Sequence, residues 1–212
     1  MAIQQKLETP TPPNLGYPPE EYERRNFNES NGSLNAYFRK VTAVLSSVFG
    51  IRGSRYINAP YGAFQSTVDQ TAAAINTAYA MTFNTTDFTN GITVVSNSRI
   101  TVTDSGIYNL QWSGQFENSD SQDHDARIWI KVNGTNLVGS TGFAGIPSKH
   151  GAVNGHTIVG WNYNLSLNAN DYIQLWWETD STTVSIQAYD AASNYPSTAS
   201  LIATMQFVSN TM

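Results

Sequence analysis

The most restrictive feature of this chain is the run SGIYNLQWSGQF at residues 105–116, in which large apolar and small polar side chains alternate. A period of two is typical of a strand with one face in a core and the other in water. Similar alternation returns downstream, so the sequence predicts a sandwich of antiparallel strands. The apolar positions that set the inward face are Tyr108, Leu110, Trp112 and Phe116.

Turn-forming sequences divide the rest of the chain into short segments. Asn133-Gly134, between two alternating runs, is typical of a two-residue hairpin turn. Strands at this spacing predict a mainly β fold with two sheets in a jelly roll. The strands that we predict cover residues 63–70, 80–83, 92–95, 99–102, 106–116, 126–132, 156–167, 172–178, 184–188 and 201–208.

Two adjacent tryptophans, Trp176 and Trp177, fall within one predicted strand, so their side chains must point to opposite sides of it. We expect one of them in the core. The other is expected at a subunit interface, where aromatic side chains are enriched.

Three segments precede the predicted head at residues 61–212. Residues 1–19 are rich in Pro and predict an extended docking arm that orders against a partner. Residues 20–50 predict a helical stalk, with Pro19 and two Glu near its start and Asn31-Gly32 as a candidate interruption. Ser33 would cap a second start, and residues 51–60 predict a linker.

Apolar residues on the predicted helix recur at steps of three and four, which favours an apolar stripe along one side. Two interpretations are open: the helix packs on its own domain, or three copies form a short parallel bundle supported by the domain that follows. The stripe consists of Leu34, Tyr37, Val41, Val44 and Val48.

Composition excludes several classes of function. Charged residues make up 13% of the 212 residues and the net charge is -5, so nucleic acid is not expected as a partner. The chain has no Cys, which excludes disulfides, thiolate metal sites and Cys nucleophiles. No apolar run is long enough to predict insertion into a membrane.

An acidic loop is the strongest candidate for binding a cation. Hard cations such as Ca²⁺ prefer several oxygen ligands, but the loop lacks the spacing of an EF-hand, and a solvated polar loop is the alternative. His150 and His156 lie in loop-like surroundings, where we expect hydrogen bonds that fix the loops. The acidic loop holds Asp120, Asp123, His124 and Asp125.

Exposed aromatic side chains are candidates for stacking on sugar rings beside Asn and Asp side chains. They are Phe143, Tyr189, Tyr195 and one of Trp176 and Trp177. Ser148 near His150 is a weak hint of a nucleophile, and no Gly-x-Ser-x-Gly elbow is present. We therefore predict neither catalytic residues nor a cofactor, with Ca²⁺ as the open exception.

The head resembles the C1q/TNF-like jelly roll. The resemblance is carried in order by residues 63–66, 83–84 with 91–92, 105–108, 133–134 and 168–175. It implies a homotrimer carried on a stalk. More particularly, the chain is similar to heads in structural proteins of tailed bacteriophages, marine and cyanobacterial ones above all, where a short N-terminal anchor precedes the head.

The resemblance implies a non-enzymatic virion protein, fibre-like or attached to the tail or neck. Residues 1–50 would dock on other virion proteins, and the loops at 120–125 and 143–156 would contact host-surface glycans. Two alternatives stay open: a capsid decoration or fibre-connecting protein without a receptor, and a soluble carbohydrate-binding module.

Overall fold

The computed structural model describes residues 10–15, 20–21, 23–49 and 59–209, without the side chains of residues 47–49. The chain divides into two compact units, Met1–Asn58 and Ala59–Met212, which we call the N-terminal unit and the head. The predicted arm is described only at residues 10–15, which have no regular secondary structure. Most of the predicted linker, residues 51–58, lies outside the described residues.

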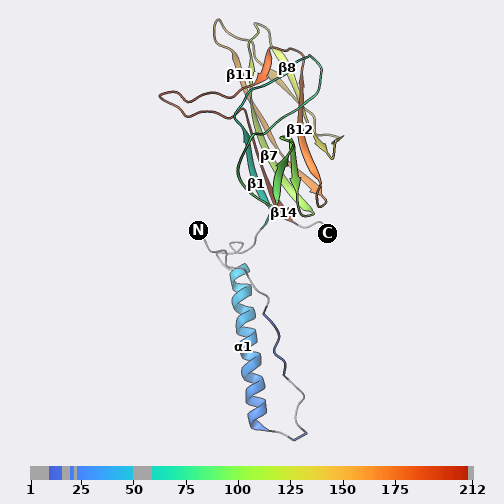
Figure 1. Cartoon of the computed structure of the whole chain (residues 1–212), viewed down its shortest axis with the longest axis vertical. Helices are drawn as coiled ribbons and strands as arrows, with labels where there is room; N and C mark the ends of the chain where they lie inside the picture. The colour runs from blue at the N-terminus through green and yellow to red at the C-terminus, as the bar shows by residue number, and fades with distance from the viewer. Residues whose placement is uncertain (1–9, 16–19, 22, 50–58, 210–212) are drawn as a thin grey trace. The chain divides into compact units, whose positions relative to one another are not determined.

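The N-terminal unit contains one continuous helix, α1 (Arg24–Phe49) (Figure 1). Its first turn is closed by the backbone N–H of Phe27, which donates to the Glu23 carbonyl at 3.1 Å. The predicted start at residue 20 is therefore too early. The predicted interruption at residues 31–32 is wrong, because the Ser33 hydroxyl donates to the Glu29 carbonyl at 3.0 Å, within the helix, instead of capping a new one.

The predicted apolar stripe lies along one side of α1 and is half-buried at Leu34, Tyr37, Val41 and Val44. The fifth stripe residue, Val48, lies in α1, but its side chain is outside the described residues. Phe38 and Leu45 stay exposed. Within the described residues, no helix is long and apolar enough to cross a membrane.

The described part of the head contains fourteen strands. Five predicted strands match observed strands at both ends to within one residue: 92–95, 99–102, 156–167, 172–178 and 201–208. The strands are β1 (Tyr61–Ser66), β2 (Gln70–Thr71), β3 (Tyr79–Ala80), β4 (Thr85–Asn90), β5 (Ile92–Val95), β6 (Arg99–Val102), β7 (Gly106–Asn118), β8 (His124–Val132), β9 (Thr135–Asn136), β10 (Gly142–Ile146), β11 (Gly155–Leu167), β12 (Tyr172–Thr179), β13 (Val184–Ile186) and β14 (Leu201–Ser209).

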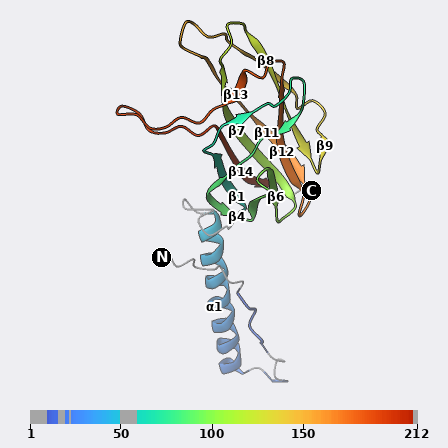
Figure 2. The ribbon, with the colours of Figure 1, turned by 45° about the horizontal axis from the view of Figure 1, so that its top comes forward.

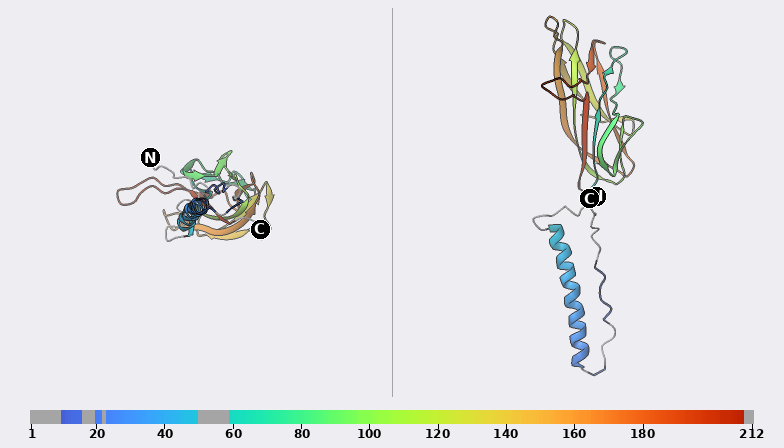
Figure 3. Two further views of the ribbon diagram at one scale, coloured as in Figure 1. Left: turned by 90° about the horizontal axis from the view of Figure 1, so that it is seen from below. Right: turned by 60° about the vertical axis from the view of Figure 1, so that its left-hand side comes forward.

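These strands form two sheets, and every pairing between them is antiparallel. Sheet A runs β2-β13-β7-β14-β1-β4, with β11 on the other side of β7; sheet B runs β10-β8-β12-β6-β5, with β3 on β12 and β9 on β8. The chain crosses repeatedly from one sheet to the other. The predicted mainly β, two-sheet architecture is therefore confirmed, and Figure 3 shows both sheets within the head.

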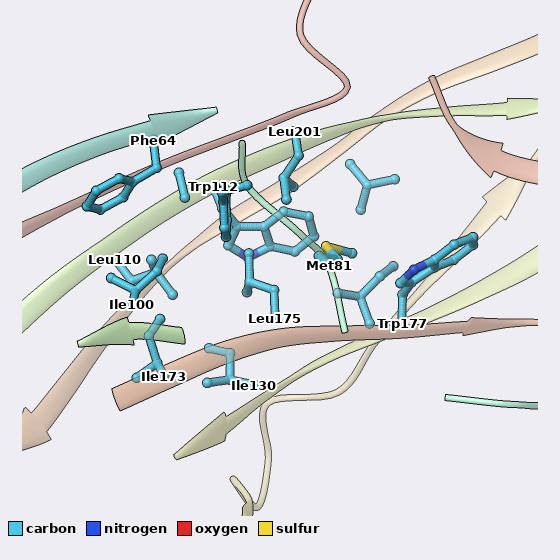
Figure 4. Packing of buried hydrophobic residues seen from close by; sticks show 14 of the residues in the cluster. Phe64, Met81, Ile100, Leu110, Trp112, Ile130, Ile173, Leu175, Trp177 and Leu201 are labelled. Carbon is cyan, nitrogen blue, oxygen red and sulfur yellow. The ribbon is translucent and has the colours of Figure 1, made fainter. Parts of the chain in front are cut away.

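A single apolar core fills the space between the sheets (Figure 4). The alternation that opened the sequence is confirmed, because the four predicted inward residues of β7 are buried. Trp112 meets Trp161 of β11 edge to face, with ring centroids 4.8 Å apart, and Phe116 meets Trp177 at 5.8 Å. These ring contacts add to the area that each side chain removes from water.

The hairpin predicted at Asn133-Gly134 is confirmed. Both residues have positive φ, 50° and 81°, as the favoured two-residue turn requires, and Val132 pairs with Thr135 across it. The predicted strand at 80–83 is wrong beyond Ala80, although Met81 and Phe83 are buried. The segment between β13 and β14 projects away from the sandwich (Figures 1 and 2).

Candidate functional site

At one end of the head, the ring of His124 lies between two carboxylates. Its Nε2 is 3.0 Å from Asp120 Oδ2 and its Nδ1 is 3.2 Å from Asp180 Oδ1. Asp180 also accepts the backbone N–H of Asp125 at 3.1 Å. The 119–123 loop and the adjoining strand β8 are thereby joined to the turn after β12, which is distant in sequence.

The acidic loop also holds the loop that follows β10. The backbone N–H of Ser148 donates to Asp123 Oδ1 at 2.7 Å, and that of Lys149 donates to the Asp120 carbonyl at 2.7 Å. These bonds with Ser148 hold the pKa of Asp123 below its usual value. Hydrogen bonds from His124 and from the Ser121 N–H likewise lower the pKa of Asp120. The Ser148 side chain contributes to this lowering of the Asp123 pKa together with the Ser148 N–H.

Beneath these loops lies a fully buried amide, Asn118, at the end of β7. Its Nδ2 donates to the carbonyls of Gln122 at 2.7 Å and Pro147 at 3.2 Å. Its Oδ1 accepts the Asp120 N–H at 2.9 Å and the Thr183 hydroxyl at 3.1 Å. A buried amide that satisfies four groups fixes the three loops that it touches.

The carboxylates of Asp120 and Asp123 are thus used as acceptors for protein donors. Among the described residues, no group of three or more His, Asp or Glu side chains is arranged to hold a metal ion. The Ca²⁺ site suggested by the sequence stays a prediction.

A second polar cluster lies near the end of β7 in sheet A, around Glu117. The Tyr189 hydroxyl donates to Glu117 Oε2 at 2.6 Å, and Asn154 Nδ2 donates to Oε1 at 2.8 Å. His156 is directly opposite Glu117 in the β7–β11 register, with its Nδ1 3.1 Å from the same hydroxyl. Burial, together with the bond to Glu117, raises the pKa of Tyr189.

This cluster anchors the projecting segment between β13 and β14. Tyr189 pairs with Thr198 at the base of that segment, and Ala192 pairs with Tyr195 further out. Tyr195 is exposed, as predicted for a binding aromatic. His150 lies elsewhere, in a turn closed by two backbone hydrogen bonds with Val153, at 2.8 and 3.1 Å.

Phe143, the remaining predicted binding residue, lies apart from both clusters on the outer face of sheet B. It is opposite Arg127 in the β10–β8 register, and 73% of it is exposed. The predicted binding residues are therefore divided among three places. These are the end loops, the Glu117 cluster with the segment that it anchors, and the outer face of sheet B.

The two adjacent tryptophans point to opposite sides of β12, as predicted. Trp177 is 1% exposed within the head's own core, so it is removed from the predicted interface residues. Trp176 is half-buried on the outer face of sheet B, with Lys131 Nζ 3.6 Å from its ring centroid. Lys131, on the neighbouring strand β8, therefore covers one side of the Trp176 ring. The interface role predicted for Trp176 stays a prediction.

The outer face of sheet A has a different character. Its outward-facing residues on β7, β11 and β14 are mostly Asn, Gln, Ser, Thr and Ile, and on these three described strands Glu117 alone is a carboxylate and no Lys or Arg occurs. Asn109 Nδ2 donates to the side-chain oxygens of Asn162 and Asn164, at 2.6 and 2.8 Å. Ile158 is 68% exposed on the same face.

Sequence reasoning did not bring Glu117, Asn118, Asn154 and Asp180 into these clusters. These contacts join residues far apart in the chain, so local spacing carries no signal for them. The outer face of sheet B could have been found, because Arg127, Trp129 and Lys131 alternate with predicted core residues.

Comparison with known proteins adds no family: neither a protein-family model nor a curated protein matches the sequence.

Proposed function

We propose that this chain is a non-enzymatic structural protein of a tailed-phage virion. In this proposal, three copies assemble through jelly-roll heads, and residues 1–50 dock on other virion proteins. The resemblance of the head to C1q/TNF-like jelly rolls supplies the number three, and the similarity to heads in structural proteins of tailed bacteriophages supplies the virion setting. The order of strands in the two sheets is compatible with a jelly roll.

The observation that carries the proposal is the uncharged outer face of sheet A. A solvent-facing surface usually carries about a quarter to a third charged residues, whereas interface cores are depleted of charge. Three neighbouring strands that present amides, hydroxyls and Ile158 therefore favour contact with another protein surface. A second copy fits, because the three strands carry no Lys or Arg and, apart from Glu117, no carboxylate that would have to be desolvated against a neighbouring copy.

The edge strand β11 supports the same interface. It pairs with β7 alone among the described strands, so the backbone groups along its other edge are unpaired over 13 residues. Soluble proteins commonly protect such edges with charged residues or Pro. β11 contains no Lys, Arg, Asp, Glu or Pro, which favours cover by a neighbouring subunit.

The helix α1 supports assembly at the other end of the chain. Phe38 and Leu45 flank the half-buried stripe and are themselves exposed, although a lone helix gains most of its stability from burying such a face. Three copies, or a docking partner in the virion, would provide that burial.

Light scattering of the full chain tests the assembly. We expect wild-type protein at three times the 23.3 kDa chain mass. Asn162→Lys puts a charge in the middle of the proposed interface and should shift the mass to a single chain. Val138→Lys, on a residue that is 94% exposed, introduces the same charge elsewhere and should keep the wild-type mass.

A single-chain mass for the wild type, or equal behaviour of the two variants, would overturn the assembly. The virion assignment has its own test, which is protein analysis of purified particles. Peptides of this chain in constant proportion to the capsid protein support a structural role. Their absence would favour the soluble carbohydrate-binding module.

A further inference from the structure

The outer face of sheet B gathers three of the four cationic side chains of the head. Residues 59–212 contain Arg99, Arg127, Lys131 and Lys149, against eleven Asp or Glu. The first three lie on β6 and β8 at positions that alternate with buried residues, so they point away from the core. An otherwise acidic domain therefore concentrates its few cations on one surface.

Each of these three cations lies over an aromatic ring of a neighbouring strand. A cation held against a ring is partly dehydrated and restricted in position, so it loses less freedom when a ligand contacts it. The pairs are Arg99 over Tyr172 at 4.8 Å, Arg127 over Phe143 at 6.0 Å and Lys131 over Trp176 at 3.6 Å, measured to the ring centroid.

Between the cations of β8 lies a further ring. Arg127, Trp129 and Lys131 follow one another on the same side of the strand, at steps of about 7 Å. Trp129 is directly opposite Trp176 in the β8–β12 register, and its Nε1 donates to Asn136 Oδ1 at 3.0 Å. The arrangement is a pair of neighbouring tryptophans with a cation on either side along the strand.

We propose that this surface, the cation–aromatic face, binds an acidic polysaccharide. Trp129 and Phe143 provide apolar surfaces for sugar rings, and Lys131 and Arg99 pair with the carboxylate or sulfate groups. Arg127 is already paired with Glu178, with its guanidinium nitrogen 3.1 Å from Oε1, so it positions Phe143 more than it contributes free charge. The inference rests on the proposed function for the outward role of the head. It moves the expected glycan contact from the end loops to the side of sheet B.

Hydroxyl groups, and not charge, favour a polysaccharide over a nucleic acid, the other ligand with rings and anionic groups. Nucleic acids and alginate both carry about one negative charge per unit, so the eleven carboxylates of the head oppose both alike. An acidic polysaccharide adds hydroxyl groups, which the neutral amides and hydroxyls around the rings can bond. Asn136, which holds Trp129, is one such amide.

Calorimetric titration of the full chain with alginate oligomers, a carboxylated polysaccharide, tests the proposal. Lys131→Glu should weaken binding about tenfold or more, because a charge-assisted contact becomes a repulsion. Lys149→Glu makes the same charge change away from this face and should stay within about twofold of the wild type. Phe143→Ala removes an exposed ring and should weaken binding about threefold without affecting folding.

Three results would overturn the proposal. They are no binding of alginate by the wild type, equal losses for Lys131→Glu and Lys149→Glu, and tighter binding of oligothymidylate than of alginate. Light scattering of the same samples reports the assembly separately. A single-chain protein that binds alginate would contradict the proposed trimer and support the cation–aromatic face. A trimer that does not bind alginate would support the assembly and contradict the proposed ligand.

Discussion

The two outer faces of the head differ, although one core supports both. Sheet A presents amides, hydroxyls and isoleucines, with Glu117 near the end of β7. Sheet B presents three cations, each over a ring. The strands beneath follow the same alternation of buried and outward residues. The inward residues therefore determine the fold, and the outward residues distinguish a surface suited to another copy from one suited to a charged ligand.

The largest expected effect comes from a variant that destabilises the core beneath both faces. Trp112→Ala deletes a buried ring that packs on Trp161, and should lower the free energy of unfolding by about 3–5 kcal/mol. Chemical denaturation monitors the change. Val138→Ala, at an almost fully exposed residue, is the control and should stay within about 0.5 kcal/mol of the wild type. A small loss for Trp112→Ala would contradict the shared core.

A pair of variants should separate the two faces. Asn162→Lys lies on sheet A and should change the mass of the assembly but leave the intrinsic affinity of the cation–aromatic face for alginate nearly unchanged. Lys131→Glu lies on sheet B and should weaken the binding of alginate but leave the mass of the assembly unchanged. Light scattering and calorimetry on both proteins check this. If either variant changes both readouts strongly, the faces are not independent.

The stability of the end loops depends on the buried amide of Asn118 and not on either outer face. Asn118→Ala leaves the carbonyls of Gln122 and Pro147 and two donors without their partner, and should cost about 1–3 kcal/mol of stability. Thermal unfolding measures the loss. Asn168→Ala removes an exposed amide with one side-chain bond and should cost less; an equal cost would contradict the role of Asn118.

A smaller loss of stability should be confined to the Glu117 cluster of sheet A. Tyr189→Phe removes the hydroxyl that donates to Glu117 and should cost about 0.5–1.5 kcal/mol. Hydrogen exchange should become faster at the base of the projecting segment, at Tyr189 and Thr198. Tyr195→Phe, further out on the same segment, is the matched control and should leave exchange there unchanged.

The smallest expected effect is a pH dependence of the end loops. The pKa of Asp123 is lowered by its bonds with Ser148. A carboxylate with a lowered folded pKa stabilises the fold above its ordinary pKa of 3.8, and that contribution is lost as the pH falls through the lowered value. Asp123→Asn should therefore show a flatter loss of stability on acidification than the wild type. A steeper loss would contradict the assignment.

How far the sequence alone predicts this structure depends on the kind of contact. The strands at residues 92–95 and 99–102 and the hairpin at Asn133-Gly134 were predicted, because alternation and turn chemistry are local. β4 and β10 were missed. β4 is polar and mostly exposed, and β10 contains two Gly in five residues, so neither shows the expected alternation.

The candidate sites were predicted less completely. The acidic loop and the exposed aromatics were identified by residue type. Their partners were not, because Asp180 reaches Asp125 across 55 positions and Tyr189 reaches Glu117 across 72. Such contacts depend on the pairing of β7, β8, β12 and β13. The position of Trp176 under Lys131 likewise depends on the β8–β12 register.

The most direct test of the account is the mass of the full chain in solution, measured by light scattering for the wild type, Asn162→Lys and Val138→Lys. The account predicts three times the chain mass for the wild type and Val138→Lys, and a single chain for Asn162→Lys. A wild type of single-chain mass would contradict the assignment of the uncharged face of sheet A to contacts between copies.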